Sequence, residues 1–167
     1  MTRASSNAAE LSAAVDAVRR LIRGLRLAEH RTRTATGMSA AQLFVLDQLR
    51  DADGLSLTEL AESTLTDRTS VSAVVDRLAR DGWVRSERDS RDRRRMIVRI
   101  TAAGRRRLAT APQAPTVQLI AALRRLEPRQ RRTLTSNLVA LLGAMGLADA
   151  PATMLFEEHG AGRRPRA

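Results

Sequence analysis

Six arginines lie between Arg85 and Arg95, and the acidic residues of this segment are Glu87, Asp89 and Asp92. The eleven residues therefore carry a net charge of +3. A guanidinium group donates paired hydrogen bonds to phosphate oxygens, and a cluster of such groups attracts polyanions. The residue types and their spacing predict contact with a polyanion rather than bond-breaking chemistry.

The helix predicted just before this segment has one side suited to a DNA groove. Val71, Val74, Val75 and Leu78 recur at helical spacing and predict a single buried stripe. The other side carries short, hydroxylic or basic side chains: Thr69, Ser72, Ala73, Asp76 and Arg80, flanked by Arg68 and Arg77. Such side chains can reach base edges and phosphates. Taken by itself, this pattern is equally consistent with a solvated helix face.

The neighbouring sequence predicts a helix-turn-helix. Ser56 and Glu59 form an S-x-x-E capping box, which indicates a short helix beginning at Ser56. Residues 63–65 break its apolar pattern. Thr66 is predicted to cap the second helix, which extends over about Asp67 to Asp81. Ser39 with Gln42 predicts a second capping box before Ser56, and Thr101 is predicted to cap a short helix after the arginine-rich segment.

A β-hairpin is predicted around the arginines. Trp83 and Val84 open one strand, and the return strand is the run Met96 to Ile100, in which Met96, Val98 and Ile100 alternate with Ile97 and Arg99. The order helix, turn, helix and hairpin predicts a winged helix-turn-helix. A basic wing beside such a helix favours a polyanionic partner.

Three motifs in this region resemble the MarR (multiple antibiotic resistance regulator) family of bacterial transcription factors. They are DRLARDGWVR from Asp76 to Arg85, DSRDRR from Asp89 to Arg94, and ITAAG from Ile100 to Gly104. The resemblance extends over about residues 10–146. It implies a mostly α fold with a small β-hairpin wing, in which residues 37–101 form a winged helix-turn-helix DNA-binding lobe. Residues 1–36 and 102–147 would form a helical dimerisation lobe, and 148–167 a flexible tail.

The resemblance also implies a function and its residues. We expect a homodimeric repressor that binds double-stranded DNA at a palindromic operator and is released by a small, aromatic or anionic effector. Arg68, Thr69 and Ser72 are the candidates for base edges, and Thr66 and Arg77 for phosphates. On the wing, Asp92 is expected to orient Arg94 in a narrow minor groove, which attracts cations. The other wing candidates are Arg91, Arg93 and Arg95.

A small-molecule site is expected where the dimer helices meet the DNA-binding lobe. The candidates for it are Arg26, His30, Met38 and Phe44. Arg26 is suited to a carboxylate or phenolate ligand, because guanidinium pairs in bidentate fashion with planar anions. For His30, a solvated or capping histidine near a helix end is the alternative interpretation.

Composition narrows the chemistry further. The 167-residue chain has a net charge of +11, and all 29 of its basic residues are arginine. The sequence has no cysteine, which excludes disulfides, thiolate metal sites and a cysteine peroxide sensor. His30 and His159 form no spaced metal pair, and no phosphate loop or nucleophile motif is present. We expect no catalytic residue, no metal, no cofactor and no enzyme activity.

The chain lacks any run of 18 apolar residues, and its first eleven residues do not resemble a signal peptide. A cytoplasmic protein without a membrane partner is therefore expected. Two interpretations compete with a specific regulator. One is a non-specific, nucleoid-type DNA-binding protein, and the other is a winged-helix module that binds protein.

The two ends of the chain predict helices with apolar stripes. A first helix is predicted over Asn7–Thr32, with Leu11, Val15, Val18, Ile22 and Leu25 at 4-3-4-3 spacing, followed by a polar linker over 31–37. Leu134, Leu138, Leu141 and Met145 give a similar stripe after Pro128. The stripes favour packing between two subunits. The alternative is a monomer whose two ends pack on each other.

Overall fold

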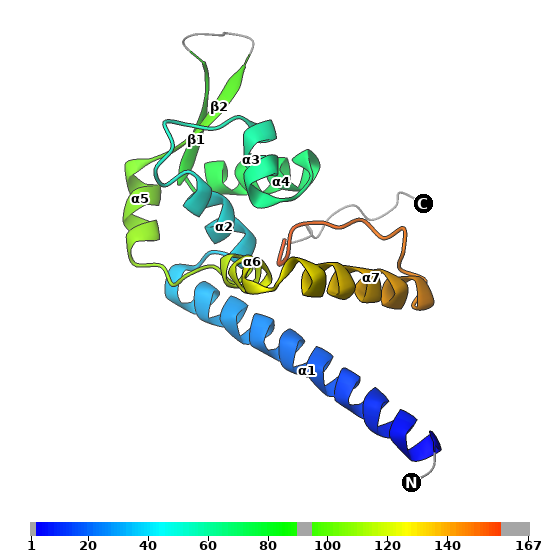
Figure 1. The fold of residues 1–167 in the computed structure, drawn as a ribbon. Helices are drawn as coiled ribbons and strands as arrows, with labels where there is room; N and C mark the ends of the chain where they lie inside the picture. Colours follow the sequence, from blue (N-terminus) through cyan, green and yellow to red (C-terminus); the bar gives the residue numbers. More distant parts are fainter. Residues whose placement is uncertain (1–2, 90–94, 158–167) are drawn as a thin grey trace, which may run out of the picture.

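The computed structural model describes residues 3–89 and 95–157, and it confirms a mostly helical fold with one antiparallel hairpin (Figure 1). In chain order the elements are α1 (Arg3–Thr36), α2 (Ala40–Gln48), α3 (Leu57–Thr64), α4 (Arg68–Arg80), β1 (Val84–Arg88), β2 (Met96–Ile100), α5 (Ala102–Ala109), α6 (Pro115–Arg125) and α7 (Pro128–Ala144). The predicted order of helix, turn, helix and hairpin is present from α3 to β2.

The core is centred on α2. Every residue from Ala40 to Leu46 is buried, because α2 contacts α3 and α4 as well as α1, α5 and α6. A helix that is apolar on all sides is suited to such a central position. Leu60 of α3 and Leu78 of α4 are also fully buried, and Ala114 and Val98 complete the cluster from other elements.

Three short helices begin at caps predicted from the sequence. At α2, the Ser39 hydroxyl accepts the Gln42 amide at 3.2 Å, and Gln42 Oε1 accepts the Ser39 amide at 2.9 Å. Ser56 and Glu59 form the same reciprocal pair at α3. Thr101 caps α5 by accepting the Gly104 amide at 3.1 Å. Each cap satisfies amides that the first helical turn leaves without partners.

The hairpin pairs Val84 with Ile100 and Arg88 with Met96, and Leu55 adds an isolated bridge to Val98. The predicted alternation of buried and exposed residues in β2 is wrong at its first two residues, whereas Val98 and Ile100 are buried as predicted. Ile97 is buried, because it lies over Gly54, whereas Met96 is 46% exposed. Gly54 has a φ of +89°, and an added Cβ would lie 2.3 Å from Ile97 Cγ2.

The first helix is longer than predicted and includes the expected linker. α1 continues to Thr36, and it begins before the predicted Asn7, because the helix already includes Arg3. Thr36 ends it, since its hydroxyl donates to the Thr32 carbonyl at 2.7 Å and accepts the Met38 amide at 3.1 Å. Polar composition suggested a linker, but exposed helices are also polar.

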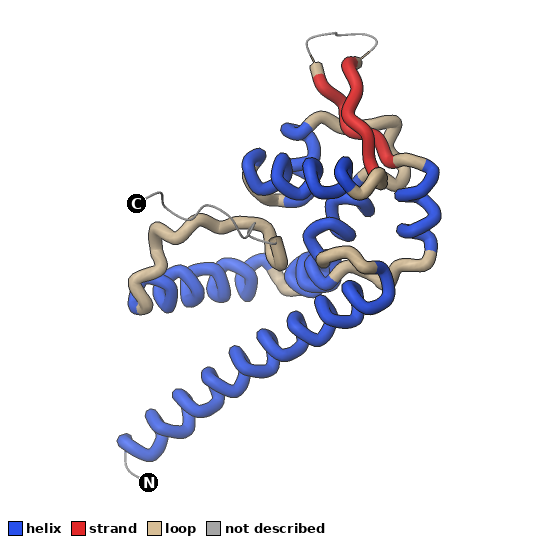
Figure 2. Tube along the Cα trace, turned by 180° about the vertical axis from the view of Figure 1, so that it is seen from behind, coloured by secondary structure: helices blue, strands red, loops and turns tan. Residues whose placement is uncertain are grey.

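Pro115 is the first residue of α6, a position where its missing amide donor costs nothing. The flexibility expected of residues 148–167 stays a prediction. Up to Glu157 the tail runs back beside α7 in both views, and Met154 is only 5% exposed (Figures 1 and 2). Met154 lies in an apolar stretch of the tail, and its burial removes apolar surface from water.

The two terminal helices α1 and α7 leave the lobe in divergent directions (Figure 2). Their apolar stripes are exposed, as Leu11, Ile22, Leu138 and Met145 illustrate, each at least 43% exposed. The ends of one chain therefore do not bury these stripes against each other. None of the described helices combines the length and apolar character that a membrane span requires.

The first testable prediction concerns Gly104, where α5 passes close to the end of α4. A Cβ there would lie 2.2 Å from the Trp83 carbonyl oxygen. Gly104→Ala should therefore lower the free energy of unfolding by roughly 1–3 kcal/mol, as overpacking does. Gly24→Ala is the matched control, because nothing lies within 4 Å of its added Cβ, and it should stabilise the chain by about 0.5–1 kcal/mol. Urea unfolding at one protein concentration measures both, and equal effects would contradict the packing described.

Candidate nucleic-acid interface

Helix α4 is held at its start by Asp67, so the predicted cap at Thr66 is wrong. The Asp67 carboxylate accepts the Ser70 amide at 2.9 Å and the Ser70 hydroxyl at 2.7 Å. These hydrogen bonds lower the pKa of Asp67. Thr66 is one position too early, because its own amide still donates to the Ala61 carbonyl and closes α3.

The turn between α3 and α4 is set by Leu65. Its φ of 54° is left-handed, a conformation that is uncommon for residues other than glycine, asparagine and aspartate. The side chain is 72% exposed, so it does not contribute to the core. This turn directs α4 across α3 so that one face of α4 packs against the core and the other face is uncovered.

The buried face of α4 is the one predicted. Val71, Val74, Val75 and Leu78 are all buried, and Ser70 joins them through its bond to Asp67. On the uncovered side Arg68 and Thr69 are exposed and Ser72 is half-buried. The three candidates for base contact therefore lie on one accessible side of α4. The phosphate candidates Thr66 and Arg77 are half-buried at its two ends.

The wing is fastened to α3 by Arg95, which directly precedes β2 at the loop end of the paired strands. Its guanidinium forms an ion pair with Glu59 and approaches the Ser56 hydroxyl at 3.4 Å. Glu59 simultaneously accepts the Ser56 amide at 2.8 Å in the capping box. Hydrogen bonds from Arg95 and Ser56 lower the pKa of Glu59 to about 2. One carboxylate thus connects the helix-turn-helix to the wing, and the DNA contact expected of Arg95 stays a prediction.

A second brace lies within β2 itself, nearer the base of the wing. Arg99 forms an ion pair with Asp53, and its Nε lies 2.5 Å from a carboxylate oxygen of Glu87. Glu87 also lies 3.2 Å from Arg85 Nε. Exposed ion pairs are individually weak, but shared partners reduce the entropy lost per pair. This network neutralises part of the positive charge near the base of the wing.

The wing-tip candidates Arg91, Asp92, Arg93 and Arg94 lie outside the described residues. Sequence reasoning missed the bracing roles of Asp53, Glu59 and Glu87. The capping box gave a signal for Glu59, but its second partner is 36 residues further along the chain. The pairing of β1 with β2 would have suggested Glu87, because the register places Arg85 opposite Arg99 and Glu87 is then the diagonal neighbour of Arg99.

The four candidates for a small-molecule site do not gather at one accessible place. Arg26 and His30 are exposed on α1, whereas Met38 and Phe44 are buried in the core at 0% and 2% exposure. Within residues 3–89 and 95–157, no three histidine, aspartate or glutamate side chains are grouped so that they could hold a metal ion.

The uncovered face of α4 and the adjoining hairpin correspond to a known family pattern. Residues 36–95 match the model of the MarR family. This stretch begins at the last residue of α1 and ends just before β2, so it contains the helix-turn-helix and most of the wing.

Three curated relatives match part of the chain, and all are named as regulators of transcription. YcgE of Bacillus subtilis, an uncharacterized HTH-type transcriptional regulator, is 38% identical over 38% of this chain and 42% of its own. The activatory protein BadR of Rhodopseudomonas palustris is 35% identical over 46% and 47%. The repressor YetL of B. subtilis is 34% identical over 43% and 44%. The chain therefore spans about half the length of the curated relatives it matches.

Solved structures extend the similarity to most of the fold. The regulator BldR from Sulfolobus solfataricus is 24% identical, and the match covers 86% of this chain and 99% of that one with a TM-score of 0.52. The regulator PcaV from Streptomyces coelicolor, solved with its natural ligand, is 25% identical over 77% of this chain and 90% of that one, with a TM-score of 0.51.

The second prediction concerns the pH dependence of the wing brace. Because folding lowers the pKa of Glu59 from 4.5 to about 2, its stabilising effect is complete above the unfolded value. It is lost as the pH falls from about 4.5 towards 2. Glu59→Gln keeps a capping side chain but loses the ion pair with Arg95. The melting temperature of the parent should exceed that of Glu59→Gln above pH 5, and the difference should shrink as the pH falls. A difference independent of pH would contradict this assignment.

Proposed function

We propose, from the match of residues 36–95 to the model of the MarR family, that the chain is a homodimeric, sequence-specific DNA-binding regulator of transcription. The observation that carries the proposal is the uncovered side of α4. Arg68, Thr69 and Ser72 lie there, next to a hairpin rich in arginine. The buried side of the same helix holds it firmly against the core, as a helix that reads DNA must be held.

In the proposed complex α4 lies in the major groove. Arg68 can donate two hydrogen bonds to a guanine edge, and Thr69 and Ser72 are short enough for close approach. The wing, braced at Arg95 and Arg99, then contacts the flanking backbone or minor groove. A net charge of +11 adds sequence-independent attraction to the phosphates, so the affinity should fall with added salt.

The proposed dimer accounts for the exposed stripes of α1 and α7. Contiguous apolar surface of this kind marks an interaction site in most proteins. A two-fold axis through these ends would present two copies of α4, and such a pair suits an operator that is an inverted repeat.

We place the effector, as an expectation of the family resemblance, where the dimer helices meet the DNA-binding lobe. A ligand that prefers one spacing of the two α4 helices would shift the population between DNA-binding and released dimers. We propose that the chain represses transcription. Since YetL is named a repressor and BadR an activatory protein, a reporter assay with and without the chain distinguishes repression from activation.

Both competing functions make different predictions for DNA. A protein-interaction module has no salt-dependent affinity for DNA. A nucleoid-type protein binds all sequences equally, so unrelated competitor DNA removes it from any duplex. The regulator proposed here keeps a preferred duplex under competition.

The third prediction tests the reading face with two arginine variants of equal charge. On a duplex that the parent selects from random DNA, Arg68→Ala should weaken binding by about 1–3 kcal/mol per subunit. Arg124→Ala removes the same charge from an exposed position on α6, in the other lobe. It should change binding much less, because salt screens the attraction between an exposed charge and DNA beyond about 8 Å. Thr69→Ala and Ser72→Ala should change which bases are preferred. Equal losses for the two arginines would indicate attraction by diffuse charge only.

The fourth prediction tests the dimer with a pair of neighbouring residues. Val18→Glu places a charge in the α1 stripe, whereas Ala17→Glu places one on the side away from it, and both positions are exposed in a single chain. Val18→Glu should give monomers in sedimentation velocity, because an unpaired charge is costly in an apolar interface. Ala17→Glu should sediment like the parent. A dimer that survives Val18→Glu would show that the α1 stripe is not the interface.

A further inference from the structure

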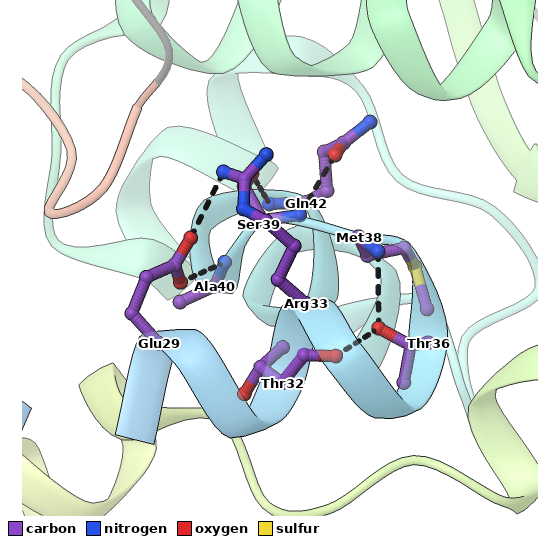
Figure 3. A network of polar contacts seen from close by, with 8 residues as sticks. All are labelled: Glu29, Thr32, Arg33, Thr36, Met38, Ser39, Ala40 and Gln42. Atoms are coloured by element: carbon purple, nitrogen blue, oxygen red, sulfur yellow. Dashed lines mark hydrogen bonds and ion pairs between the residues drawn. The ribbon is translucent and has the colours of Figure 1, made fainter. Parts of the chain in front are cut away.

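A chain of polar contacts connects α1 with α2 at the edge of the core (Figure 3). The Glu29 carboxylate of α1 accepts the Ala40 amide at 2.7 Å through one oxygen and pairs with Arg33 at 3.0 Å through the other. Ala40 is the first residue of α2, where amides lack partners within the helix and the helix dipole favours a negative charge. The start of α2 is thereby fixed to the end of α1.

Gln42 continues this chain of contacts to the recognition helix. Its Oε1 accepts the Ser39 amide at 2.9 Å in the capping box, as Figure 3 shows. Its Nε2 donates to Asp81 Oδ2 at 3.2 Å, and Asp81 is the C-cap residue of α4. Gln42 is only 7% exposed. One buried amide side chain therefore bonds to the start of α2 and to the end of α4.

The position of Asp81 is otherwise unfavourable. The carbonyl groups at a helix C-terminus carry partial negative charge, and a carboxylate there is repelled by them. A hydrogen bond from the Gln42 amide offsets that repulsion. It also supplies Gln42 Nε2 with an acceptor, and a buried donor left without one is costly.

We propose that Gln42 is a positioning residue, which sets the direction of α4 relative to α1 through its bond to Asp81. The capping role uses Oε1 only, and glutamate would fill it equally well. The Nε2 donor is what distinguishes glutamine, and its partner lies on the recognition helix. For its consequence in DNA reading this inference rests on the proposed function, since the spacing of two α4 helices depends on how each one is held to its α1.

The test measures a distance within one chain. The parent has no cysteine, so Ala17→Cys on α1 and Ala79→Cys on α4 give two unique, exposed sites for spin labels. Labelled chains are diluted with excess unlabelled parent, and pulsed electron spin resonance gives the distance distribution without DNA. α1 extends well beyond its contact with α2, so a change in its angle to α4 is amplified at Ala17 (Figure 1).

Four variants in this labelled background separate positioning from capping. Gln42→Glu keeps the capping box but faces Asp81 with a second carboxylate. It should shift the mean distance by more than about 2 Å, the scale of helix shifts in switching proteins, or broaden the distribution. Asp81→Ala, at an exposed residue that should not prevent folding, should do the same. Asp81→Asn keeps an acceptor and should match the parent. The double variant Gln42→Glu with Asp81→Asn should restore the parent distribution, because the asparagine amide can donate to the new carboxylate.

Parent-like distances for both Gln42→Glu and Asp81→Ala would overturn the proposal, as would a double variant that is not restored. DNA affinity is measured separately on the duplex selected by the parent. Asp81→Ala should weaken binding there about fivefold, although it removes a negative charge that repels DNA. A changed distance with unchanged DNA affinity would leave the positioning role intact and show that DNA binding does not depend on it. Failure of the parent to select any duplex would count against the proposed function and leave the distance test unaffected.

Discussion

The structure depends on burying one face of α4 while leaving the other uncovered. Val71, Val74 and Leu78 supply the buried face against α2 and α3. Fully burying such side chains contributes about 1.5–3 kcal/mol each, so α4 has one well-defined orientation in the lobe. The opposite face can then carry short polar and basic side chains without loss of stability. The remaining features, namely the caps, the wing braces and the Gln42 contact, control the ends of α4 and the position of the wing beside it.

Local sequence patterns predicted most of this lobe, because interactions between residues close in the sequence determine its helices. The capping boxes at Ser39 and Ser56 and the apolar stripe of α4 are confirmed, since each depends on residues within one helical turn or one helix. The errors arose where a choice depended on neighbours. Thr66 and Asp67 are both good caps, and only the hydrogen bond that closes α3 decides between them. Ile97 is buried because of Gly54, a residue on a different segment.

Contacts between residues distant in the sequence could not be predicted, because they also depend on neighbours that only the fold supplies. Arg95 looks like one more DNA-binding arginine until the fold brings Glu59 to it, and Gln42 looks like a cap until Asp81 is placed beside it. Met154 is buried although it lies in the tail, and its packing partners are distant in the sequence. The family similarity covers residues 36–95, whereas these long-range contacts show how this chain holds the uncovered face of α4.

The central claim is that two copies of α4, related by a two-fold axis, read one DNA sequence. Selection of bound duplexes from a random library, at physiological salt and with competitor DNA, tests it most directly. The account predicts enrichment of an inverted repeat with half-sites about one helical turn apart, roughly 10 base pairs between centres. Enrichment of single, unpaired half-sites would contradict the two-fold arrangement, and no enrichment of any sequence would contradict specific reading by α4.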